Sequence, residues 1–314
     1  MHAHFWGVFL FVAVVRMQYA KLPLSFDEQA KLLRSRGLIA DHDLLVERLE
    51  NVSYYRLSGY LYLFRNSDDT FKTGTTFDTV WKFYTFDRQL RLLVLDAVER
   101  IEIAVKTNLV YFHAHQHGPF GYTNPATLPG LNSDAHTGLL KKLRDEQQRN
   151  KEIFVKHFMK KYSDQHAYLP CWMASEIMTY GMMLTLLNGV EKAHKATNGS
   201  RFGVPDDVLL SWIRAIGGIR NMCAHHSRLW NKEIGYRPLI PRQKKHPEWH
   251  VPVEVKGNRI FGMFTVLKYM LNIIAPQSNW MERLVSLLEQ YPCIPKHSMG
   301  FEVNWKECPI WSNK

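Results

Sequence analysis

The sequence predicts an all-α fold, and three observations lead to this prediction. Apolar residues recur every three to four positions over long stretches, as they do on the buried side of an amphipathic helix. No stretch keeps the two-residue alternation of a half-buried strand. Helix signals also bracket the periodic stretches: Ser25 and Glu28 form a capping box, and Gly37 follows. With 46% hydrophobic residues, the 314-residue chain can form one large domain or two smaller ones.

Three short helices are expected first. The helix after Ser25 ends near Arg36, and a second covers about residues 41–51. A third covers residues 53–65 and carries five aromatic side chains, which are Tyr54, Tyr55, Tyr60, Tyr62 and Phe64. Core packing between helices is the first interpretation of these rings, and a platform for stacking nucleic-acid bases is the alternative. Turn residues predict a loop over residues 66–75.

The longest helix is predicted over about residues 76–115. Its apolar positions follow helical spacing, and they are Phe83, Phe86, Leu90, Val94, Ala97, Ile101, Ala104 and Val105. Asp87 with Arg91, and Asp96 with Arg100, are spaced for ion pairs along one helix.

Three histidines and a basic stretch follow. His113, His115 and His117 alternate, and we interpret them as solvated side chains at a fraying helix end, with a metal site as the alternative. A connection over residues 118–135 leads to a helix over residues 136–161. That helix is rich in basic residues, which are Lys141, Lys142, Arg144, Arg149, Lys151, Lys156, Lys160 and Lys161. They form either a solvated surface or a track for an RNA backbone.

The second half of the chain continues the helical pattern. A core helix is predicted over residues 170–187, then a polar loop over 188–204, and Pro205 begins the next helix. The segment after Asn231 is irregular and basic. Two more helices and a tail that packs back on the bundle complete the chain, with the helices at residues 261–274 and 279–290.

Residues 1–16 match none of these elements. Phe5 to Val15 is an apolar run of eleven residues, which is too short to cross a bilayer and lacks the flanks of a signal peptide. Met17 reads as a natural start, so we interpret residues 1–16 as the product of an upstream start. A membrane-associated N-terminus is the alternative.

Composition points to a polyanionic partner and a reducing compartment. The net charge is +11, from 40 basic and 29 acidic residues. The four cysteines are Cys171, Cys223, Cys293 and Cys308. They contain no C-x-x-C pair, which argues against a zinc framework and a disulfide scaffold and favours the cytoplasm. The sequence contains no internal repeat and no Gly-rich phosphate loop.

Residues 220–231 concentrate the polar chemistry of the chain. If one helix runs through them, Arg220, Asn221, His225 and Arg228 share a polar face. His226 then falls on the opposite, apolar side, facing inward or toward a packed interface. The helical wheel therefore assigns His225, and not His226, to the polar cluster.

An Arg, an Asn and a His on one face suit chemistry at a phosphate. The guanidinium offers a fixed fork of donors, and the imidazole exchanges protons near neutral pH. RNA carries its own nucleophile, the 2′-OH beside each phosphate, so a base and a cation are enough to cleave it. The plainer interpretation is a hydrogen-bonded polar face with one core histidine.

The stretch R-N-x-x-A-H-H-x-R-L-W-N, Arg220 to Asn231, resembles the signature of the Abi-like (abortive infection, AbiD/AbiF type) bacterial proteins. It also fits the HEPN ribonuclease pattern, an Arg followed by a His four to six positions later, and both histidines satisfy that spacing. Other stretches resemble the same family from about Leu22 to the C-terminus. They are residues 53–60, 76–91, 99–102, 170–173 and 299–305.

The resemblance implies an architecture and an activity. It implies a HEPN-like helical bundle over about residues 76–235, a small N-terminal helical segment over 22–75 and a C-terminal helical appendage over 236–314. Residues 1–21 would be an extension outside the fold. The implied activity is that of a metal-independent endoribonuclease of phage defence or of a toxin-like system, without cofactor or metal. It would work as a cytoplasmic homodimer, without stable membrane association, with an antitoxin or small RNA as a further partner.

The resemblance also assigns roles to residues. Arg220 would hold the scissile phosphate, Asn221 would orient it or the imidazole, and His225 would act as general acid or base. Supporting candidates are His226, Arg228, Glu99 and Glu102, and one of the two glutamates is expected to pair with Arg220 or to orient His225. RNA contacts are expected from Lys141, Lys142, Arg144, Lys160 and Lys161. The alternative function is a catalytically silent RNA- or protein-binding HEPN module that senses infection.

Overall fold

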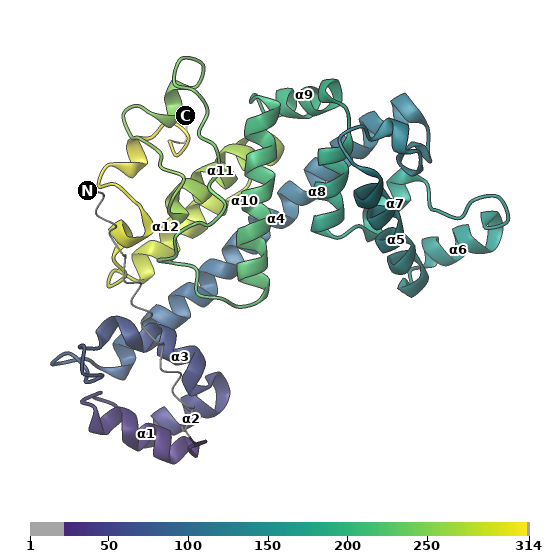
Figure 1. Ribbon diagram of the computed structural model, residues 1–314. Coiled ribbons are helices and arrows are strands. Elements are labelled where there is room, and N and C mark those ends of the chain that lie inside the picture. The colour runs from purple at the N-terminus through teal and green to yellow at the C-terminus, as the bar shows by residue number, and fades with distance from the viewer. Residues whose placement is uncertain (1–21, 313–314) are drawn as a thin grey trace, which may run out of the picture. The chain divides into compact units, whose positions relative to one another are not determined.

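The computed structural model describes residues 22–312 (Figure 1). The apolar run Phe5 to Val15 and the start at Met17 lie outside the described residues. Within that range the chain forms twelve α-helices, which confirms the all-α prediction. Backbone pairing of the strand type is limited there to two isolated bridges, Ile39 with Thr76 and Arg65 with Phe71. None of the helices in residues 22–312 combines the length and the apolar character that crossing a bilayer requires.

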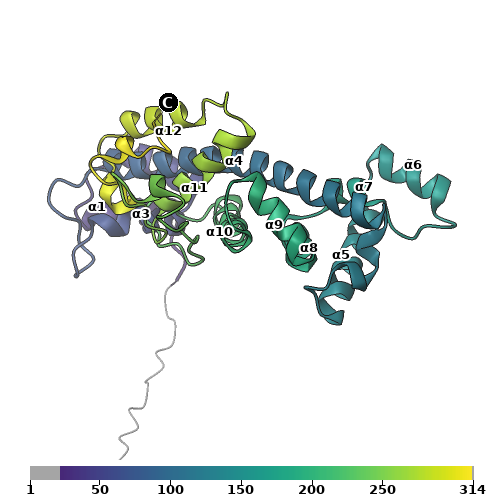
Figure 2. The same ribbon diagram turned by 90° about the horizontal axis from the view of Figure 1, so that it is seen from above.

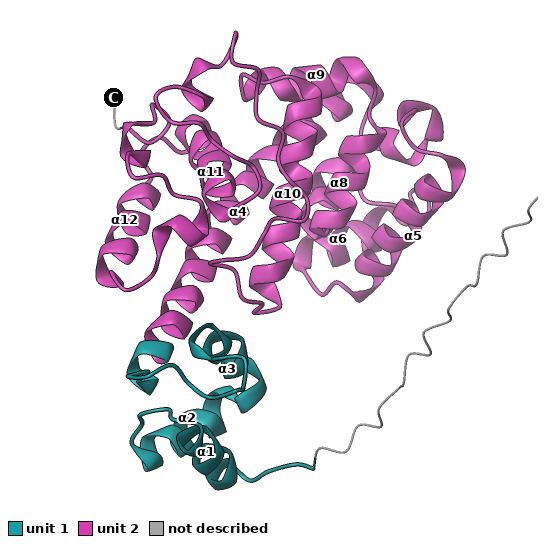
Figure 3. Cartoon of the chain, turned by 60° about the vertical axis from the view of Figure 1, so that its left-hand side comes forward, with its two compact units in different colours: residues 1–80 teal, residues 81–314 magenta. Residues whose placement is uncertain are grey.

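The chain divides into two compact units, residues 1–80 and 81–314 (Figure 3). The described part of the first contains α1 (Phe26–Ser35), α2 (His42–Val52) and α3 (Tyr54–Leu61). The capping box is present: the Ser25 hydroxyl accepts from the Glu28 N–H at 3.2 Å, and Glu28 accepts from the Ser25 N–H at 2.7 Å. Helix α1 ends before Gly37, whose φ of 96° suits glycine.

The aromatic residues of the first unit divide between core and surface. Tyr60 is 3% exposed, whereas Tyr55 is 89% and Tyr62 is 73% exposed. Core packing therefore accounts for Tyr60 and not for the other two. For Tyr62 the reason is that α3 ends at Leu61 and a 3-10 turn over Tyr62–Phe64 follows, so the helical spacing does not continue to residue 65. Tyr55 lies within α3, on its exposed side.

The second unit is organised along α4 (Phe77–His117), the 41-residue helix that the sequence predicted. Its apolar stripe is buried from Phe86 to Val105. In Figure 2, α12 (Trp280–Gln290) lies on one side of α4 and α10 (Asp206–Ala224) on the other. The indole N–H of Trp280 donates to the Leu93 carbonyl at 2.8 Å, which ties α12 to α4.

Two predicted helices are each divided in two. The stretch 136–161 forms α5 (Ser133–Arg149) and α6 (Ile153–Tyr162), because Asn150 is extended and its side chain accepts from the Glu152 N–H at 2.8 Å. The stretch 170–187 forms α7 (Cys171–Ile177) and α8 (Tyr180–Gly189), because Met178 is extended and Thr179 begins a new helix as its cap.

The predicted polar loop over residues 188–204 is wrong, because α9 (Lys192–Arg201) occupies most of it. This helix buries His194, Asn198 and Gly199 rather than apolar side chains, so hydrophobic spacing could not reveal it.

The three alternating histidines also differ from the prediction. Helix α4 continues to His117, and His113 is 1% exposed rather than solvated. Helical spacing places His113 beside His117, with ring centroids 4.9 Å apart, while His115 is exposed.

The C-terminal part agrees with its prediction. Helices α11 (Ile260–Ile274) and α12 cover the expected stretches, and the tail packs back on them through buried residues such as Trp305 and Trp311. The Trp311 indole N–H donates to the Thr265 hydroxyl at 3.0 Å. All four cysteines are free thiols, as the absence of a disulfide pattern predicted.

Candidate functional site

Helix α10 ends at Ala224, inside the segment Arg220–Asn231 that concentrates the polar chemistry. The His226 N–H donates to the Cys223 carbonyl at 3.0 Å, and the Ser227 N–H donates to the Met222 carbonyl at 2.8 Å. These two bonds form a Schellman motif, in which the residue after the cap takes a left-handed backbone conformation. His226 occupies that position with a φ of 56°.

The early end of α10 overturns the helical-wheel placement of the last residues. His226 was expected to face the apolar side, but it is exposed, as is His225, the capping residue. Arg228 lies beyond the helix and is half-buried. The physical reason is that the left-handed residue reverses the chain direction, so the 100° step per residue stops at Ala224.

Arg220, Asn221 and His225 lie together on the last turn and cap of α10. Arg220 is half-buried, and its Nη1 donates to the Asn221 side-chain oxygen at 3.5 Å. The His225 N–H donates to the Asn221 carbonyl at 2.9 Å. Asn221 and His225 are exposed, so the imidazole and the amide are open to a ligand.

A buried carboxylate of α4 holds the chain just beyond these histidines. Asp87 is 0% exposed. One of its oxygens accepts from the Leu229 N–H at 3.1 Å and from the Trp230 N–H at 2.8 Å. Its other oxygen accepts from Nη1 of Arg91 at 2.5 Å, and the same nitrogen donates to the Ser227 carbonyl at 3.3 Å. The loop after His226 is thus fixed at three residues: Asp87 holds the N–H groups of Leu229 and Trp230, and Arg91 holds the Ser227 carbonyl.

Apolar contacts close around this buried ion pair. The Trp230 ring meets the edge of Phe83 at a centroid distance of 5.3 Å, and Leu229 and Trp230 are at most 2% exposed. Sequence reasoning identified Asp87 and Arg91 only as residues spaced for an ion pair along one helix. The signal that marks Asp87 is its place on the wheel, about 20° from Val94 and about 40° from Phe83 on the apolar side of α4.

The two glutamates proposed as partners of Arg220 have other surroundings. Glu99 is exposed. Glu102 pairs with Lys106 at 2.8 Å, and the Lys106 ammonium also donates to the Met178 carbonyl at 2.8 Å. In residues 22–312, neither glutamate forms an ion pair with Arg220, and a role of either one in orienting His225 stays a prediction.

Tyr180 lies close enough to both Glu102 and Arg220 for each of them to act on its hydroxyl electrostatically. Its hydroxyl donates to the Ile213 carbonyl at 2.5 Å, and its ring lies so close to Gly217 that a Cβ there would approach a ring carbon to 2.7 Å. Burial raises the pKa of Tyr180 above its ordinary value, Glu102 raises it further, and Arg220 lowers it. Tyr180 therefore stays neutral and serves as a packing surface behind Arg220.

The basic residues expected to bind RNA lie in another part of the second unit. Lys141, Lys142, Arg144, Lys160 and Lys161 are all exposed on α5 and α6. Figures 1 and 2 both place α5 and α6 beside the C-terminal end of α4, away from the last turn of α10. Asp87, which holds the loop after α10, lies in the first third of α4.

A scan against protein families found one match. The model of a family described as "Abi-like protein" matches residues 47–231, more than half of the chain. The chain belongs to the Abi-like protein family. The match includes Asp87 and Arg91 of α4 and ends at Asn231, the last residue of the polar segment. No curated protein and no solved structure matches this Abi-like protein.

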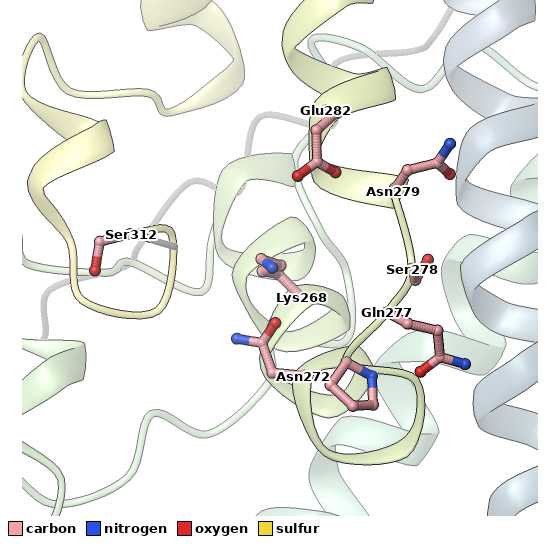
Figure 4. A pocket seen from close by; sticks show the side chains of 8 residues that line it. Lys268, Asn272, Gln277, Ser278, Asn279, Glu282 and Ser312 are labelled. Atoms are coloured by element: carbon pink, nitrogen blue, oxygen red, sulfur yellow. The ribbon is translucent and has the colours of Figure 1, made fainter. Parts of the chain in front are cut away.

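Across residues 22–312, no group of three or more His, Cys, Asp or Glu side chains is arranged to hold a metal ion, including the three histidines of α4. A polar cavity of about 490 Å³ lies elsewhere, between α11, α12 and the tail (Figure 4). Burial lowers the pKa of Lys268 in that cavity, and Glu282 opposes the effect.

Proposed function

We propose that this Abi-like protein is an endoribonuclease of the abortive-infection type that cleaves RNA by attack of the 2′-OH. The observation that carries the proposal is the gathering of Arg220, Asn221 and His225 at the exposed end of α10, just before a loop fixed by Asp87. Family membership supports the link to abortive infection. The net charge of +11 suits a polyanionic substrate.

The three side chains divide the chemical work. His225 accepts the proton of the 2′-OH, and the 2′-oxygen attacks the neighbouring phosphorus. The bond between phosphorus and the 5′-oxygen breaks, and that oxygen takes up a proton. The products are a 2′,3′-cyclic phosphate and a 5′-OH end. Arg220 holds the phosphate and stabilises its additional negative charge in the transition state, and Asn221 orients the phosphate or the imidazole.

The reaction needs an acid as well as a base. One chain supplies one Arg220–His225 set, and a second copy of the chain would supply the imidazolium that protonates the leaving 5′-oxygen. A homodimer is therefore part of the proposal. His226, exposed beside His225, is the alternative source of this proton within one chain.

Mapping the ends of cleaved RNA tests the proposal. Purified protein is incubated with cellular RNA in EDTA, and cleavage to cyclic-phosphate ends is expected to persist. His225→Ala should lower the rate by about 10²–10⁴-fold. Arg220→Lys should be nearly as damaging as Arg220→Ala, because an ammonium lacks the forked donors. The control is His157→Ala, which removes an exposed histidine of α6 and should cleave like wild type.

The alternative function predicts a different result. A non-catalytic RNA- or protein-binding module that senses infection would leave RNA intact with or without His225. RNA that is bound but never cut by the wild-type protein would replace the nuclease proposal with this one. Cleavage that stops in EDTA and returns with a divalent ion would overturn the metal-independent chemistry.

A further inference from the structure

A basic segment begins directly after the candidate site. Residues 232–245, which we name the basic strap, contain five basic residues and one acidic residue. The basic residues are Lys232, Arg237, Arg242, Lys244 and Lys245, and all five are exposed. Glu233, the acidic residue, pairs with Arg259 at 3.2 Å. None of the five cations forms an ion pair with another residue in the range 22–312, so all five can face an external anion.

The basic strap runs back along α10 from the candidate site. At its start, Arg259 donates to the Asn231 carbonyl at 3.3 Å. Further along, the Leu239 N–H donates to the Ser211 hydroxyl at 3.0 Å, and the Trp212 indole N–H donates to the Leu239 carbonyl at 2.8 Å. Ser211 and Ala224 are separated by about 20 Å of helix. The basic strap therefore follows α10 for about that length, ending on the side away from His225.

The backbone of the basic strap is held in place although it has no helix. Ile234, Pro238 and Pro241 are buried, and the Ile234 N–H donates to the Asn258 carbonyl at 3.1 Å. A ring nitrogen of His250 lies 2.7 Å from the Pro241 carbonyl. Prolines have no N–H to satisfy and restrict φ, so an irregular segment held at these points stays rigid. Its exposed side chains are thus presented in a fixed order.

Tyr236 gives the basic strap a ring among its cations. Its side chain is 66% exposed, between Lys232 and Arg237. An exposed aromatic ring among unpaired cations is the combination that binds single-stranded nucleic acid, because cations hold phosphates while the ring stacks on a base. A base in a duplex is already stacked and is not available to such a ring.

We propose that the basic strap is the surface along which single-stranded RNA approaches the candidate site, with a base stacked on Tyr236 and phosphates on Arg242, Lys244 and Lys245. This rests on the proposed function for the identity of the strand. It differs from the expectation that RNA binds along Lys141 to Lys161, because the basic strap is continuous with Asn231 while α5 and α6 lie beside the other end of α4.

Equilibrium binding to a strand that cannot be cleaved tests this surface. The probe is a short, fluorescently labelled RNA in which every 2′-OH is methylated, and binding is followed by anisotropy. Tyr236→Ala should weaken binding roughly tenfold, while Tyr236→Phe should bind like wild type, because the ring and not the hydroxyl stacks. The pair Lys244→Gln and Lys245→Gln should lower the slope of log affinity against log salt by about 1.4.

The chain offers a matched control for the lysine pair. Lys141 and Lys142 are also adjacent and exposed, on α5, and replacing both with Gln should leave the affinity and the salt slope unchanged. Loss of affinity with the α5 pair and not with the pair in the basic strap would overturn the proposal. Equal sensitivity of duplex binding to Tyr236→Ala would also overturn it, since a duplex offers no base to the ring.

The proposed RNA-binding surface and the proposed nuclease activity can be disproved independently of each other. If wild-type protein leaves natural RNA intact but Tyr236→Ala weakens binding of the methylated strand, the nuclease proposal falls and the binding surface stands. If natural RNA is cleaved but none of the changes in the basic strap alters binding, the binding surface falls and the nuclease proposal stands. Thermal melting of each variant accompanies the binding curves, and exposed side chains predict unchanged melting temperatures.

Discussion

His226 carries backbone strain at the end of α10. Its φ of 56° is the left-handed conformation that glycine adopts freely and a residue with a Cβ adopts at a cost. Most Schellman motifs have glycine at this position. Here the position holds a histidine, which is exposed and adjacent to His225. Strained backbone of this kind is typical of functional sites.

Replacing His226 with glycine is expected to stabilise the protein while removing an imidazole from the site. Relief of the left-handed strain should raise the free energy of unfolding by roughly 0.5–1 kcal/mol, measured by urea denaturation. His226→Asn is the comparison, because Asn tolerates this conformation better than His and should raise stability by less than glycine does. Cleavage measured on the same samples tells whether the imidazole contributes. A less stable glycine variant would mean that side-chain contacts of His226 outweigh the strain.

At the scale of elements, α4 and the loop after α10 act together. The loop has no regular structure of its own, and its Leu229 and Trp230 N–H groups donate to the Asp87 carboxylate. The position of the histidines therefore depends on α4 as well as on α10. Arg91 neutralises the buried carboxylate and adds a bond to the Ser227 carbonyl.

Asp87→Ala should lower the free energy of unfolding by about 3–5 kcal/mol, because it removes the carboxylate that faces the buried Arg91 guanidinium and accepts from the Leu229 and Trp230 N–H groups. The matched control is Asp96→Ala on the same helix. Asp96 also pairs with the arginine four residues later, but that pair is partly exposed, and its loss should cost less than about 1 kcal/mol. Denaturant titration of both variants gives the comparison. An equal loss of unfolding free energy in the two variants would show that burial does not increase the contribution of the Asp87–Arg91 pair to stability.

At the scale of the whole molecule, buried histidines limit stability in acid. His113 and His194 are 1% and 4% exposed, and their rings stack at a centroid distance of 6.1 Å. Neither ring nitrogen of either residue has a hydrogen-bond partner in the described structure. Burial, with smaller contributions from His117 and His194, lowers the pKa of His113 from 6.5 to about 4, and burial also lowers the pKa of His194.

These depressed pKa values make global stability fall as the pH falls. Between pH 6.5 and pH 4 the unfolded chain binds a proton on residue 113 that the folded chain does not, so stability rises with pH across that window. The penalty is absent above pH 6.5 and reaches on the order of 3 kcal/mol at pH 4 for His113 alone. His113→Phe should flatten this dependence, measured as the denaturation midpoint against pH. His115→Gln, on the exposed side of α4, should leave it unchanged, and an unaltered slope in His113→Phe would contradict the assignment.

The sequence by itself determined those helices that bury an apolar face. The stripe from Phe86 to Val105 predicted α4, and the capping box at Ser25 predicted the start of α1, because helical spacing and caps are local properties. The same reasoning missed α9, which buries His194 and Asn198 and so lacks an apolar stripe. The polar segment Arg220–Asn231 was also recognisable from its residues alone.

Only the tertiary structure decided how that segment is presented. Asp87 and Leu229 are 142 residues apart in the chain, and no local spacing relates them. Their hydrogen bonds fix the loop after α10, and the left-handed His226 ends the helix before Arg228. Both histidines are therefore exposed, where a continued helix would have buried one of them. The physical reason is that a helix can end where other parts of the chain supply hydrogen-bond partners for the backbone N–H and C=O groups of its last turn and of the loop beyond it. Such partners are in place only once the chain is folded.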